Sequence, residues 1–112
     1  MRLRVLILAA GLLWPTSAFS QAAPGYFISG NKLYKDCSAP PGSPKNGICI
    51  GYVEGITDAL NMNGTVCTPA DVTVTQAEQV IVKYIREDNP EYRRIAASLL
   101  AGAALGQAFP CK

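Results

Sequence analysis

The segment CTPADVTVTQAEQVIVKYIREDNPE, residues 67–91, joins a cysteine, two helix-capping patterns and an amphipathic helix. Thr73 is followed three positions later by Gln76, and Thr75 by Glu78, so two overlapping capping boxes are available to start the helix. Apolar residues continue from there at helical spacing, namely Ala77, Val80, Ile81, Tyr84 and Ile85. The segment therefore predicts a capped helix with one core face and a cysteine just upstream.

Three more helices are predicted around this one. Upstream, residues 29–38 and 48–64 carry apolar side chains at helical spacing. Downstream, Asn89 and Pro90 predict a stop and a new start, because proline is tolerated at the first helical position. The expected core residues of the last helix are Tyr92, Ile95, Ala96, Leu99, Leu100, Ala103 and Phe109.

The predicted helix at 48–64 separates an apolar face from a polar one. Its core stripe consists of Cys49, Tyr52, Val53, Ile56, Ala59 and Leu60, and its polar face of Glu54, Thr57, Asp58 and Asn61. Before it, residues 39–47 contain three prolines and two glycines, which predict a surface loop rather than helix. No segment shows the alternating apolar and polar pattern that is typical of a β-strand. The predicted fold is all-α, a compact bundle of about four short helices.

The N-terminal 20 residues are typical of a secretory signal peptide. Arg2 and Arg4 form a basic region, an apolar run follows, and Ala18 and Ser20 fit a cleavage site before Gln21. The apolar run is shorter than the roughly 20 residues that a membrane span requires, so no stable anchor is expected. We therefore expect a periplasmic protein of residues 21–112. Loss of two arginines leaves eight basic against eight acidic residues, and this zero net charge argues against a nucleic-acid-binding surface.

Four cysteines, at positions 37, 49, 67 and 111, fall in this exported region. An even number in an oxidising compartment predicts two disulfides, and counting alone allows three pairings. Antiparallel neighbouring helices favour Cys37 with Cys49 and Cys67 with Cys111. Pairing Cys49 with Cys67 is disfavoured, because about 12 helical rises separate them by roughly 18 Å, against a disulfide Cα separation of about 5.5 Å.

The sequence offers no recognisable catalytic or metal-binding set. Histidine is absent, and no C-x-x-C motif occurs. Glu54 and Asp58 form an i, i+4 carboxylate pair, but no nucleophile or base accompanies them. We therefore predict neither an enzyme nor a cofactor or metal, and we interpret Asp58 as a structural or solvated residue. Gly51 and Gly55 form a small-xxx-small pair, which would let another helix approach closely within the fold or across a dimer. We interpret both as structural residues with an ordinary packing role.

Six segments, in order, resemble the Rap/Tai immunity domain: LYKDC (33–37), CIGYVEGITDAL (49–60), CTPADVTVTQ (67–76), VIVKYIREDNPEYR (80–93), AASLLAGAAL (96–105) and AFPC (108–111). Members of that family are small exported helical proteins. Some neutralise peptidoglycan-cleaving amidase toxins delivered by type VI secretion, and some are dimers. The resemblance implies a protein toxin as the partner of this chain, and it leaves a homodimer open.

Two surfaces compete as the predicted contact with a partner. One is the charged turn near residues 83–94, whose predicted partner-binding residues are Arg86, Glu87, Asp88, Glu91, Arg93 and Arg94. The other is the proline-rich loop at 39–47, whose rigidity would lower the entropy lost on binding. The predicted function is an immunity protein, or inhibitor, of a cell-wall-degrading toxin. A small periplasmic stress chaperone is the alternative, and a hydrolase ranks last.

Overall fold

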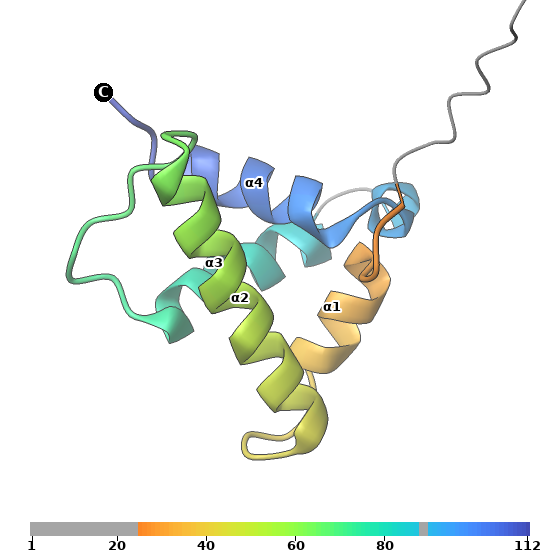
Figure 1. Ribbon diagram of the computed structural model, residues 1–112. Helices are drawn as coiled ribbons and strands as arrows, with labels where there is room; N and C mark the ends of the chain where they lie inside the picture. The colour runs from red at the N-terminus through yellow and green to blue at the C-terminus, as the bar shows by residue number, and fades with distance from the viewer. Residues whose placement is uncertain (1–24, 88–89) are drawn as a thin grey trace, which may run out of the picture.

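The computed structural model describes residues 25–87 and 90–112, so the predicted signal peptide lies outside the described residues. The elements are α1 (Gly30–Cys37), α2 (Pro44–Met62), α3 (Val74–Glu87), the 3-10 helix η1 (Pro90–Arg94) and α4 (Ala97–Ala108) (Figure 1). Within the described ranges there is no β-strand, only an isolated bridge between Ser29 and Ala96. None of the described helices is long and apolar enough to cross a membrane. The predicted all-α fold is confirmed.

One core joins the four α-helices. Helix α3 buries Ala77, Ile81 and Ile85, the face that its spacing predicts. The remaining core side chains come from every other α-helix and from the loop after α2: Leu33, Cys49, Val53, Val66, Ala97, Leu100, Ala101, Ala104 and Leu105. Because side chains from all four helices meet here, burial of this apolar surface stabilises the fold as a unit.

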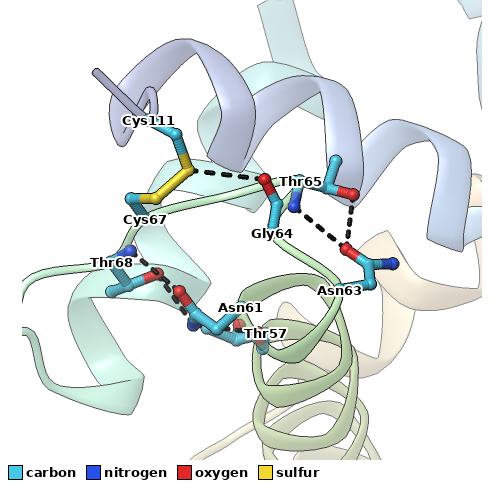
Figure 2. Close-up of a disulfide and its surroundings, with 8 residues drawn as sticks. All are labelled: Thr57, Asn61, Asn63, Gly64, Thr65, Cys67, Thr68 and Cys111. Carbon is cyan, nitrogen blue, oxygen red and sulfur yellow. Dashed lines mark hydrogen bonds between the residues drawn. A yellow bond between two sulfur atoms is a disulfide. The ribbon is translucent and has the colours of Figure 1, made fainter.

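Both predicted disulfides are present. Cys37 pairs with Cys49, with 5.0 Å between the Cα atoms, and Cys67 pairs with Cys111, with 4.9 Å between them. The first closes the turn between α1 and α2. The second, drawn in Figure 2, joins the loop after α2 to the C-terminal segment. The described residues contain no free cysteine.

Of the two overlapping capping boxes, the structure forms the first, between Thr73 and Gln76. The Thr73 amide donates to the Gln76 side-chain oxygen at 2.9 Å, and the Gln76 amide donates to the Thr73 hydroxyl at 3.2 Å. Helix α3 accordingly begins at Val74, directly after its cap.

Helix α2 begins earlier than its sequence predicts. The expected loop at 39–47 is wrong over its last four residues, because α2 already starts at Pro44. Ser43 caps this end by accepting a hydrogen bond from the Asn46 amide at 3.2 Å, and Pro44 occupies the first turn, where its missing amide hydrogen is not needed. Gly42, with a φ of 81°, makes the turn before the cap.

The predicted last helix is broken, and its core face is partly wrong. Residues 90–94 form the separate helix η1, and α4 starts only at Ala97. This break rotates the buried face, so that Leu99 is 65% exposed and Tyr92 54% exposed. Within α4 the buried positions are Ala97, Leu100, Ala101, Ala104 and Leu105, of which only Leu100 belongs to the predicted set.

A close approach at the start of α1 accounts for the break. The Gly30 amide donates to the Ile95 carbonyl, and the Ala97 amide to the Ile28 carbonyl, both at 2.9 Å. A Cβ at Gly30 would collide with the Leu100 side chain and would lie 2.9 Å from the Arg93 carbonyl oxygen. This pairing holds residues 95 and 96 out of helical geometry, and only glycine fits at position 30.

Candidate interaction surface

The turn between α3 and α4 presents most of the charged residues predicted to contact a partner. Arg86, Glu87, Glu91 and Arg94 are exposed. A terminal nitrogen of the Arg86 guanidinium lies 3.9 Å from a carboxylate oxygen of Glu87. An ion pair this long and this exposed adds little to the stability of the fold. Asp88 lies outside the described residues. The turn therefore offers charges of both signs to solvent.

Arg93 differs from its charged neighbours, because its side chain is turned inward. Its Nε donates to the Ile85 carbonyl and its terminal nitrogen to the Arg86 carbonyl, each at 2.8 Å. Its guanidinium carbon lies 5.1 Å from the centre of the Tyr34 ring. These carbonyls belong to the last turn of α3, so Arg93 caps this helix and ties it to α1. The sequence places a basic residue near a helix end, but does not show that the chain turns back there.

The proline-rich loop is short and held at both ends. With α2 starting at Pro44, only residues 38–43 remain between α1 and α2. The disulfide of Cys37 anchors the beginning of the loop, and the Ser43 amide donates to the Pro40 carbonyl at 3.0 Å. The loop is therefore ordered and small.

Gly51, Gly55 and Asp58 are all exposed on α2. A Cβ added at either glycine would meet no atom within 4 Å, so no other described helix approaches α2 closely at these positions. Asp58 forms no hydrogen bond or ion pair with residues 25–87 or 90–112. The tight contact that a glycine does permit is at Gly30.

Asn61 supplies the helix-to-loop hydrogen bonds instead of Asp58. Its side-chain oxygen accepts from the Thr68 amide at 2.9 Å, while its side-chain nitrogen donates to the Thr68 hydroxyl at 3.1 Å and to the Thr57 carbonyl at 2.9 Å. Figure 2 shows these bonds beside the Cys67–Cys111 disulfide. The Cys67 amide also donates to the Phe109 carbonyl at 3.0 Å. The loop between α2 and α3 is thus fixed along its first half.

A groove of about 200 Å³ lies between α2 and this fixed loop. It is lined by residues of α2, of the loop and of the start of α3, namely Val53, Glu54, Thr57, Asp58, Thr68, Val72, Thr73, Val74 and Ala77. The carboxylates predicted to be solvated, Glu54 and Asp58, are thus at the surface as expected, and they belong to a groove that sequence reasoning did not find. The loop that forms its second wall is placed by Asn61, whose partner lies seven positions away.

A further acidic residue, Glu78, lies beside the Cys37–Cys49 disulfide. Burial raises the pKa of the Glu78 carboxyl, which lies within 4.8 Å of the sulfur atoms of Cys37 and Cys49. Those sulfurs are bonded to each other, so neither is a thiolate that would bind a metal. Burial also raises the pKa of the Tyr52 phenol, and a hydrogen bond with Ser98 partly offsets this increase.

A protein-family model matches the part of the chain that holds the helices and both disulfides. The family model of Rap1a immunity proteins matches residues 29–111, which run from the N-cap of α1 to the last cysteine. Comparison with curated protein sequences gives no match. The match covers all the described helices and both disulfides, so the resemblance seen in the sequence is confirmed. The chain belongs to the Rap1a immunity protein family.

Proposed function

We propose that this protein is exported to the periplasm, where it binds and neutralises a peptidoglycan amidase toxin delivered by type VI secretion. The observation that carries the proposal is the family match over residues 29–111, since immunity proteins act by binding a toxin. Two disulfides support an oxidising compartment. Residues 1–20 would be the cleaved signal peptide, and residues 21–112 the immunity domain.

The scaffold suits a binding inhibitor. Two disulfides, the Arg93 cap and the Asn61 bonds hold its loops in place, so little conformational entropy would be lost when a toxin docks. Within the charged turn, we propose Arg86, Glu87, Glu91 and Arg94 as toxin contacts, because their side chains are exposed. Arg93 is left out of this set, because its guanidinium caps α3.

Co-expression tests the proposal. A candidate amidase toxin encoded beside this gene is directed to the periplasm, with and without the full precursor, and cell lysis is followed by turbidity. We expect the precursor to prevent lysis. The matched control lacks residues 2–20 and stays in the cytoplasm, where it should give no protection. Equal lysis with and without the precursor, together with no complex between the purified proteins, would refute the immunity function.

A further inference from the structure

The groove between α2 and the loop at 63–73 combines two negative charges with uncharged walls. Glu54 and Asp58 lie one helical turn apart on α2, and both side chains are exposed. Neither forms an ion pair or a hydrogen bond within residues 25–87 and 90–112, and no basic residue is among those that line the groove. The groove therefore has a net negative charge that the described part of the chain does not neutralise.

The walls are suited to the stem of a long side chain. Val72 and Val74 are half-buried and supply apolar surface, Val53 and Ala77 also line the groove but are buried, and three threonines supply methyl and hydroxyl groups. The hydroxyl oxygen of one of them, Thr57, is buried and has no hydrogen-bond partner among the described residues. Lysine and arginine cover apolar surface with their methylenes while their charged heads bind carboxylates. A groove that offers both apolar surface and carboxylates matches that division.

The groove is also rigid before any ligand binds. One wall is the helix α2, and the other is held by the Cys67–Cys111 disulfide and the two bonds between Asn61 and Thr68. The start of α3 is fixed by the reciprocal bonds between Thr73 and Gln76. A preformed groove loses little entropy when it is filled, whereas a mobile loop would have to be ordered first.

We propose that this groove receives a basic side chain, lysine or arginine, of the bound partner protein, with Glu54 and Asp58 binding its charged head. For the identity of that partner, the toxin, the proposal rests on the proposed function. It adds a contact surface that is separate from the charged turn between α3 and α4.

The first test uses the protein purified from the periplasm and a small probe. N-acetyl-arginine methylamide is titrated while backbone amide shifts are recorded by NMR. We expect saturable shifts confined to residues 53–58 and 68–77, and none with the equally shaped but neutral capped citrulline. The variant Glu54→Gln/Asp58→Asn should abolish the shifts, whereas Glu87→Gln/Glu91→Gln, which removes the same charge elsewhere, should retain them. Shifts that are equal for both variants, or equal for citrulline, would overturn the proposal.

The second test uses the complex with the toxin and separates this proposal from the proposed function. Losing the two carboxylates should weaken toxin binding about tenfold, mainly by faster dissociation and with a reduced dependence on salt. Unchanged affinity of Glu54→Gln/Asp58→Asn would refute the groove contact while the immunity function stands. If the native protein does not bind the toxin at all, the immunity function fails, and the identity of the partner proposed for the groove fails with it.

Discussion

The two ends of α3 are held by different means. Just before its first residue, the chain is fixed by the Cys67–Cys111 disulfide, the Asn61–Thr68 bonds and the Thr73 capping box. At its last turn, the single side chain of Arg93 binds two carbonyls and lies over Tyr34. The first end combines a covalent bond with several local ones, and the second depends on one residue. The comparison indicates that the groove lies at the better-secured end, and the charged turn at the end that is easier to disturb.

The largest expected effect is removal of the covalent bond at the first end. Cys67→Ala/Cys111→Ala should lower the free energy of unfolding by about 4 kcal/mol, the chain-entropy value for a loop of this size, given a sequence separation of 44. Both cysteines are exposed, so little packing is lost with them. Urea unfolding followed by circular dichroism measures the change. A loss below about 1 kcal/mol would mean that the noncovalent bonds alone hold this end.

Removal of the Arg93 cap should come next. Arg93→Ala should destabilise the fold by about 2 kcal/mol, because two hydrogen bonds to a charged donor and a ring contact are lost. Arg93→Lys keeps the charge but not the forked geometry, and should recover only part of the loss. The matched control is the exposed Arg94→Ala, expected within about 0.5 kcal/mol of the native protein. Equal effects at the two arginines would contradict the capping role of Arg93.

Removal of the Asn61 hydrogen bonds should destabilise the fold less than removal of the Arg93 cap. Asn61→Ala should cost about 1.5 kcal/mol, because the Thr68 amide and hydroxyl lose their partner. Faster hydrogen exchange of the Thr68 amide, with little change in α4, would localise the effect to the loop. Asn63→Ala is the control, since among the described residues the Asn63 side chain accepts hydrogen bonds only from Thr65, two positions on, in an exposed turn. Exchange at Thr68 that is unchanged would show that the disulfide alone positions this loop.

The smallest loss of stability should come from removal of the Thr73 side chain, which caps the start of α3. Thr73→Ala should destabilise the protein by about 1 kcal/mol, the usual contribution of an N-cap side chain. Thr75→Ala tests the second frame of the overlapping capping boxes and should change stability less, because Thr75 lies inside α3. The two variants are compared in the same thermal unfolding experiment. A larger effect at Thr75 would favour the second frame in solution.

The sequence predicts the features of α3 that depend on local chemistry. The helix itself, its core face and both disulfides follow from spacing, capping patterns and cysteine positions. The start of α2 is not predicted, because the proline at position 44 is typical of a loop, whereas here it occupies the first turn of a helix.

The remaining features depend on contacts between distant segments. The break before α4 arises from backbone bonds of residues 28 and 30 to residues 95 and 97, which no local pattern encodes. The inward turn of Arg93, in the middle of an exposed charged cluster, depends on the α3 carbonyls that the chain returns to. The groove likewise requires a loop to be laid against α2. Local chemistry therefore predicts α3 and its cap, whereas the break before α4 and the surfaces proposed to bind the toxin require the tertiary fold.

The most direct test of the account is inhibition of the toxin by the purified native protein. Peptidoglycan hydrolysis by a fixed amount of the candidate amidase is measured as the protein is added, and binding is followed in parallel by calorimetry. We predict that hydrolysis falls to the background at the same molar ratio at which the calorimetric binding curve saturates. A complex that leaves hydrolysis unchanged, or the absence of any complex, would contradict the conclusion that this protein works as an inhibitor.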